Sequence, residues 1–154
     1  RIVTVDGDCV NEPKNLLVPI GTSALDVIEA CGGLRRSPKK LIFGGPMMGV
    51  SVPSVDEVIV KNTGAVLCFA EADAVLPEPT ACIRCGRCID TCPLNLMPVE
   101  LERAYQKRDG AALKKLKVNL CMECGCCAFT CPGKLPLVEK FRLGKKMLRE
   151  AANK

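Results

Sequence analysis

The sequence has 154 residues, a length that allows one large domain or two small ones. Lys and Arg (22) exceed Asp and Glu (17), giving a formal net charge of +5, and the absence of His excludes imidazole catalysis, Rieske-type ligation and histidine-containing zinc sites. Aromatic residues make up 3% of the chain and do not interleave with basic runs, so we expect no nucleic-acid partner. No apolar run approaches the roughly 18 residues of a transmembrane helix.

The first 43 residues predict a small α+β module. Apolar and polar residues alternate over residues 2–7, which predicts a strand ending at a glycine turn, and the apolar segments 16–20 and 41–43 predict two more strands. Residues 24–31 predict a helix that stops at two glycines. The order strand, strand, helix, strand indicates a β-grasp-like fold.

Within this module, Thr22 or Ser23 can supply the N-cap of the helix, and Leu25, Val27 and Ile28 are expected to face the core. Three cysteines have no motif around them and no neighbouring base, so we expect small buried apolar side chains at Cys9, Cys31 and Cys68.

Residues 44–69 extend the β-rich region. GGPMMG at 44–49 predicts a tight turn that packs Met47 and Met48 into an interface; a phosphate-binding loop is less favoured, because the Walker Lys-Ser/Thr is absent. Two strands are expected, around residues 55–61 and at 65–69.

The segment LPEPT at 76–80 predicts a proline-stiffened linker. We therefore expect a first domain at residues 1–75 and a second at 81–154.

The second domain is organised around one cysteine pattern that occurs twice. CIRCGRCIDTCP and CMECGCCAFTCP both have the spacing C-x2-C-x2-C-x3-C-P. This spacing holds cubane [4Fe-4S] clusters, and in two-cluster proteins the fourth cysteine of each run serves the other cluster. We assign the first cluster to Cys82, Cys85, Cys88 and Cys131. We assign the second cluster to Cys121, Cys124, Cys127 and Cys92.

Two other uses of these cysteines remain open. Disulfides are possible with twelve cysteines, but the repeated two-residue gap is poor for a disulfide framework. Zinc could take two C-x2-C pairs, but it would leave the cysteine before each proline without a function.

Several residues beside the runs bear on the clusters. Gly86 and Gly125 are expected to let backbone N–H groups approach cluster sulfides. Cys127 keeps the spacing of the first run, so Cys126 is interpreted as a packed free thiol.

Charged residues also differ between the runs. Arg84 and Arg87 lie in the first, and Glu123 lies in the second at the place of Arg84. Since positive charge favours the reduced form of a cluster, we expect the first cluster to have the higher potential.

Helices follow the cysteine pattern. Residues 99–108 and 111–118 predict two short helices split at Asp109-Gly110, and a final helix begins near Pro136. Helices between the runs favour an α-helical ferredoxin domain. The final helix has a basic face, interpreted as a solvated surface rather than a docking site for an acidic partner or an anionic membrane: Lys140, Arg142, Lys145, Lys146 and Arg149.

Taken together, GTSALDVIEACGGL, IFGGPMMGV, LPEPTACIRCGRCIDTCPLNLMP and LCMECGCCAFTCPGKLPLVEKFR resemble the C subunit of Rnf-type complexes, the ion-translocating ferredoxin:NAD+ oxidoreductases. The resemblance covers nearly the whole chain. It implies a soluble-ligand-binding β-grasp (SLBB) module at residues 1–43 and a dicluster domain at 80–154. Residues 44–69 also resemble the flavin-carrying subunit of respiratory complex I.

The resemblance implies a one-electron relay between ferredoxin-derived electrons and an FMN/NAD site. It places FMN and NAD(H) in an N-terminal domain that this chain lacks, and a start at Arg1 without Met leads us to expect a fragment. No catalytic residue is expected here. The implied partners are the other subunits of a membrane complex, with ferredoxin as indirect donor, at the cytoplasmic face of the membrane.

Two other functions stay open. A cobalamin reductase of the microcompartment type also joins flavin, β-grasp and cluster domains, and its β-grasp would bind a ligand. A metal-stapled structural protein with no redox role is the third interpretation.

Overall fold

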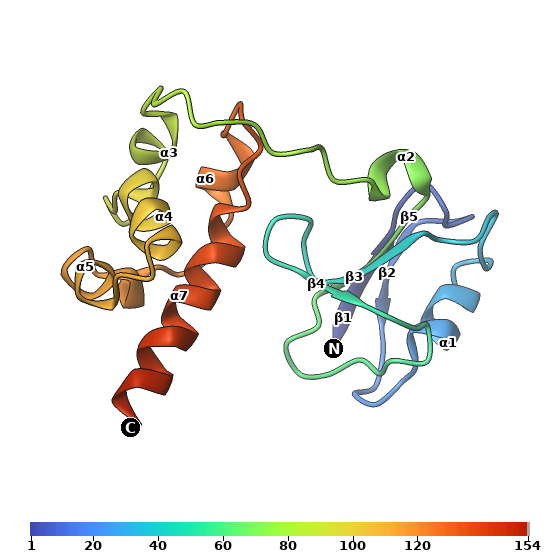
Figure 1. The fold of residues 1–154 in the computed structure, drawn as a ribbon. Coiled ribbons are helices and arrows are strands. Elements are labelled where there is room, and N and C mark those ends of the chain that lie inside the picture. Colours follow the sequence, from blue (N-terminus) through green and yellow to red (C-terminus); the bar gives the residue numbers. More distant parts are fainter. Residues whose placement is uncertain (154) are drawn as a thin grey trace. The chain divides into compact units, whose positions relative to one another are not determined.

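The computed structural model describes residues 1–153, apart from the side chain of Asp73. The chain divides into two compact units, Arg1–Leu76 and Pro77–Lys154 (Figure 1). Each unit has its own hydrophobic core. The boundary falls inside the segment that the sequence assigns to a linker. A mixed sheet in the first unit and helices in the second confirm the predicted α+β class.

The first unit is built on a five-stranded mixed sheet in the order β2-β1-β5-β3-β4. Its strands are β1 (Ile2–Asp6), β2 (Lys14–Leu17), β3 (Lys40–Phe43), β4 (Val50–Val52) and β5 (Ala65–Phe69). Strand β1 pairs antiparallel with β2 and parallel with β5, while β3 pairs antiparallel with both β5 and β4. A short helix, α2 (Glu71–Ala74), follows the last strand.

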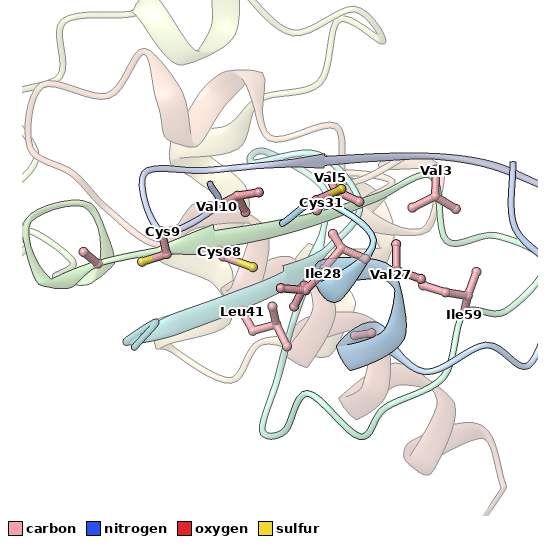
Figure 2. Close-up of a cluster of buried hydrophobic side chains, with 13 residues drawn as sticks. Val3, Val5, Cys9, Val10, Val27, Ile28, Cys31, Leu41, Ile59 and Cys68 are labelled. Atoms are coloured by element: carbon pink, nitrogen blue, oxygen red, sulfur yellow. The ribbon is translucent and has the colours of Figure 1, made fainter. Parts of the chain in front are cut away.

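One face of this sheet is covered by helix α1 (Ala24–Glu29). Val3 and Val5 are fully buried between exposed neighbours, as the two-residue period of a strand requires, and each stabilises the fold by about 1.5–3 kcal/mol. Val27 and Ile28 of the helix are buried with them (Figure 2). Leu25 is 38% exposed, so its predicted inward position is wrong. The helix residues that face this core are Ala24, Val27 and Ile28.

The N-terminus of α1 is capped by Ser23 rather than Thr22. The Ser23 hydroxyl accepts a hydrogen bond from the Asp26 N–H at 3.1 Å and donates one to the Asp26 carboxylate at 2.7 Å. Thr22 instead donates to the Pro19 carbonyl at 3.0 Å.

The cysteines outside the two runs are buried, as predicted. Cys9, Cys31 and Cys68 all have no exposed surface and belong to the same core (Figure 2). Burial raises the pKa of the Cys68 thiol to about 11, so this side chain stays protonated and apolar at neutral pH. The interpretation of these three residues as small core side chains is confirmed.

The predicted strand around residues 55–61 is wrong. Val58 makes only an isolated bridge to Ser23, because the segment pairs its backbone with the start of α1 instead. Its Glu57 carbonyl accepts from the Ala24 N–H at 2.8 Å, which satisfies a helix N–H that has no partner within the helix. The edge strand at this side of the sheet is instead β4 (Val50–Val52), which the sequence analysis did not predict.

Two smaller departures have local causes. Strand β2 ends at Leu17 rather than at residue 20, because Pro19 has no N–H for a ladder. The GGPMMG segment forms the predicted turn, closed by a 2.7 Å hydrogen bond from the Gly49 N–H to the Gly45 carbonyl. Met47 and Met48 are exposed there, and their packing into an interface stays a prediction.

The second unit is helical (Figure 1). Its elements are α3 (Arg87–Asp90), α4 (Pro98–Gln106), α5 (Gly110–Lys115), the 3-10 helix η1 (Val118–Leu120), α6 (Cys126–Phe129) and α7 (Leu137–Ala152). Helices α4, α5 and α7 pack on one another around Leu101, Leu113 and Phe141, which are almost completely buried. Asp109 caps α5 by accepting from the Ala112 N–H at 2.9 Å. The three helices predicted from periodicity are confirmed.

Across residues 1–153, we find no helix that combines the length and the apolar character needed to span a bilayer.

Candidate cluster-binding site

The two cysteine runs form an internal repeat in which counterparts lie 39 positions apart, from Cys82 to Cys121. Gly86 and Gly125 have left-handed φ angles of 82° and 85° and are the N-caps of α3 and α6. Arg84 and Glu123 also match, at φ 55° and 60°. Because L side chains seldom adopt this region, glycine is favoured at the two caps for its backbone conformation. The runs therefore fold into the same loop twice.

The first loop borders a cavity of about 120 Å³. Cysteines of both runs line it: Cys82, Cys85, Cys88 and Cys131. Apolar side chains from the two halves, including Ile89, Val99 and Leu137, form much of the remaining wall. This cavity therefore brings together the four residues that the sequence assigns to the first cluster.

A second, smaller cavity of about 20 Å³ borders the other loop. It is lined by the other predicted set: Cys121, Cys124, Cys127 and Cys92. Val138 and Phe141 of α7 contribute apolar surface. A space of this size holds about one water molecule, so it has to widen when a cluster is taken up. The four thiols are nevertheless the donor set that a cubane needs.

A single metal ion fits the arrangement less well. Zinc requires its four thiolates at about 2.3 Å from one centre. The spacing C-x2-C-x2-C-x3-C-P is the one that binds cubane clusters, so the four thiols at each cavity favour a cluster over zinc.

Backbone N–H groups are directed at the cysteine sulfurs. The Leu96 N–H donates to Cys92 Sγ and the Glu123 N–H donates to Cys121 Sγ, each at 3.4 Å. Hydrogen bonds of this kind stabilise negative charge on sulfur and help to set the reduction potential of a cluster.

Burial raises the thiol pKa of three cysteines in the runs. It raises the pKa of Cys127 to about 12, and it also raises those of Cys88 and Cys121. The ammonium group of Lys145 acts in the opposite direction on the pKa of Cys121. Since iron is bound by thiolates, uptake of a cluster must release protons from these residues.

Ion pairs lie beside both cavities, and the sequence analysis did not predict them. Glu102, only 5% exposed, lines the first cavity and accepts a hydrogen bond from Lys140 Nζ at 2.5 Å. At the second loop, Glu123 binds both Lys145 and Arg142 of α7, at 2.6 and 2.7 Å. These contacts lower the pKa of Glu123.

The predicted solvated face of the last helix is therefore only partly correct. Lys146 and Arg149 are exposed, but the side chain of Lys145 is only 12% exposed. The i,i+3 spacing of Arg142 and Lys145 is visible in the sequence, yet nothing local identifies Glu123 as their partner.

Cys126 lies outside both cavity linings, at the position that Arg87 has in the first run. It is half-buried rather than packed, and a hydrogen bond with the side chain of Cys124 raises its pKa. Its neighbour Cys127 is the residue that lines the cavity.

Comparison with known proteins identifies both units. Residues 2–51 match the SLBB domain family, and residues 74–132 match the 4Fe-4S dicluster domain family. The dicluster match agrees with the iron-sulfur prediction.

Related proteins resemble the chain across both units. The C subunit of the ion-translocating oxidoreductase complex of Rhodobacter capsulatus is 42% identical over 150 residues, 97% of this chain and 29% of that protein. The C subunit of the proton-translocating ferredoxin:NAD(+) oxidoreductase complex of Clostridium ljungdahlii is 42% identical over 107 residues, 70% of this chain and 23% of that protein. A Na(+)-translocating counterpart from Acetobacterium woodii is 36% identical over 107 residues, 70% of this chain and 24% of that protein.

The chain thus spans less than a third of the length of the relatives it matches. The predicted resemblance is confirmed: by its SLBB and dicluster domains and its 42% identity over almost all of its length, the chain is homologous to the C subunit of ion-translocating oxidoreductase complexes.

Proposed function

We propose that this chain is the electron-relay part of the C subunit of such a complex and that it holds two [4Fe-4S] clusters in interlocked sites. The observation that carries the proposal is the lining of the two cavities, where three cysteines of one run meet the fourth cysteine of the other. Cys92 and Cys131 are the exchanged ligands. Such clusters, when bound, accept and donate single electrons.

The residues of the chain supply the surroundings that this relay needs. Apolar side chains form part of the wall of each cavity, and backbone N–H groups directed at Cys92 and Cys121 stabilise charge on sulfur. Because each site uses thiols from both runs, the two sites are parts of one folded unit, which favours transfer between them.

The activity of the whole protein is also part of the proposal. The relatives are named as subunits of ion-translocating complexes that, in two cases, act on ferredoxin and NAD(+). We propose that this chain passes electrons between ferredoxin-derived donors and an FMN/NAD site elsewhere in such a protein. We place it peripherally at the cytoplasmic face of a membrane, together with the other subunits of the complex.

Anaerobic analysis of the purified chain tests the cluster proposal. Reconstituted protein should contain about eight iron and eight sulfide per chain, and its reduced form should give the electron paramagnetic resonance signal of two interacting spins. Zinc, or iron for a single cubane, would contradict the proposal.

The exchange of ligands needs a separate test. Cys131→Ser should damage the cluster held mainly by the first run, although the substitution lies in the second. Cys126→Ser is the matched control, because Cys126 lies outside both cavity linings, and it should keep both clusters.

A further inference from the structure

The two ligand loops carry opposite charges at matching positions. Glu123 lies between Cys121 and Cys124, and its counterpart Arg84 lies between Cys82 and Cys85 with the same backbone conformation. The difference in sign has a structural consequence, because Glu123 can bind cations of the neighbouring helix and Arg84 cannot.

Helix α7 supplies those cations from one face. Lys145 Nζ donates to the Glu123 carboxylate at 2.6 Å and to the carbonyl oxygen of Cys121 at 2.6 Å. Arg142, one turn earlier, donates through Nε to the other Glu123 oxygen at 2.7 Å. Lys145 therefore contacts both the first ligand residue and the acidic residue of the second loop.

The corresponding positions of α4 do not make these contacts. Arg103, the counterpart of Arg142, pairs with Glu100 of its own helix at 2.8 Å. Gln106, the counterpart of Lys145, donates a hydrogen bond to the carboxylate of Glu102 in the same helix. Within residues 1–153, the ion pairs to a ligand loop reach the second loop and not the first.

We propose that Lys145 is a positioning residue of the second cluster site, which holds the loop 121–125 against α7 and places a positive charge beside the first ligand. This inference rests on the proposed function, since it requires a cluster at that site. Reduction adds a negative charge to the cluster, so a nearby cation favours the reduced form and raises the potential. Lys145 is largely shielded from solvent, which limits screening of its charge by salt.

The contact also changes the electrostatic balance of the second loop. Glu123 alone would disfavour reduction of the second cluster, but two cations accompany its carboxylate. The higher potential expected for the first cluster from Arg84, Arg87 and Glu123 stays a prediction. The difference in potential between the first and second clusters should be smaller than the charges of Arg84, Arg87 and Glu123 alone imply.

Potentiometric titration of the reconstituted 154-residue chain tests this proposal, with electron paramagnetic resonance as the readout at each potential. Lys145→Gln should shift the potential of the second cluster to a lower value, and Glu123→Gln should shift it to a higher value. Lys145→Arg should keep it close to wild type. Lys146→Gln is the control for loss of one charge on α7, because Lys146 is 72% exposed and lies 3.9 Å from Glu150, and it should leave the potential unchanged.

Iron release to a chelator gives a second measurement. Lys145→Gln and Glu123→Gln should both release iron from the second cluster faster than wild type, because each removes a contact that holds the loop. Complete loss of the second cluster in Lys145→Gln, with the first retained and both retained in Lys146→Gln, would also support the positioning role.

Three results would overturn the inference. One is equal potentials and release rates in Lys145→Gln and Lys146→Gln. Another is a shift of the potential in the same direction in Lys145→Gln and Glu123→Gln. The third is a wild-type chain that takes up no clusters, which would refute the proposed function itself and is recognised by iron analysis before any variant is made.

Discussion

Lys140 Nζ lies 2.5 Å from the Oε1 atom of Glu102, and the pair joins helices α7 and α4 beside the first cavity. The carboxylate is almost completely buried, and the lysine side chain is 20% exposed. A buried ion pair is costly to break from one side, because the remaining charge loses its counter-ion; at Glu102 only the neutral amide of Gln106 would remain as a partner.

Lys140→Met should therefore destabilise the chain by about 3 kcal/mol. The double variant Glu102→Gln/Lys140→Met should be less destabilised than Lys140→Met, since it leaves no uncompensated carboxylate. Urea unfolding followed by circular dichroism measures the free energies. Additive effects of the two substitutions would show that the pair is not coupled.

Cys92→Ser is the counterpart of the Cys131→Ser test. The substitution lies in the first run, but the thiol lines the second cavity. We expect loss of the cluster at the second site and retention of the one at the first. The iron content should fall toward half of the wild-type value, and electron paramagnetic resonance should show loss of the spin interaction. Loss of the first cluster alone would mean that each run binds its own.

Alkaline pH should destabilise the first unit through Cys68. The folded-state pKa is raised from 9.0 to about 11 by burial, so the folded chain holds a proton that the unfolded chain releases. The stability is fully present below pH 9 and falls as the pH rises from 9 to 11. At pH 11, the loss of folding free energy from this group is about 2 kcal/mol.

Unfolding in urea at pH 7.5 and 10.5 measures this dependence. Cys68→Ala should lower the free energy of unfolding at pH 7.5, because it leaves a small cavity. Between pH 7.5 and 10.5, however, the free energy of unfolding should fall less in Cys68→Ala than in wild type. An identical pH dependence in the two proteins would exclude Cys68 as the source.

Removal of the Ser23 cap should weaken helix α1. Ser23→Ala removes the hydroxyl that accepts from the Asp26 N–H, and it should lower the free energy of unfolding by about 1 kcal/mol. Ser51→Ala, at an exposed position of β4, is the control and should change it by less than about 0.5 kcal/mol. Equal effects of the two substitutions would contradict the capping role.

Much of the cluster-binding unit follows from the sequence because its information is local. Cysteine spacing determines which thiols one loop can present, and glycine at residues 86 and 125 suits the left-handed backbone that both loops adopt. The helices at 98–106, 110–115 and 137–152 follow from periodicity and from breaks such as Asp109-Gly110. In the first unit, alternating Val3 and Val5 predict a strand with one buried face.

Other features depend on contacts between distant residues. Residues 55–61 have the composition of a strand, but their backbone bonds to the start of α1, which no local pattern reveals. Leu25 has the same apolar character as Ile28, and only the position of the sheet decides which of them is buried.

By itself, the sequence determined which thiols each loop can offer, the repeat and the helices, since these depend on spacing over a few residues. The tertiary structure decided which charges lie beside the clusters. Glu102 meets Lys140 and Glu123 meets Lys145 across 38 and 22 residues. Such pairs form only when the helices pack, because screened charges on a flexible chain do not select one partner.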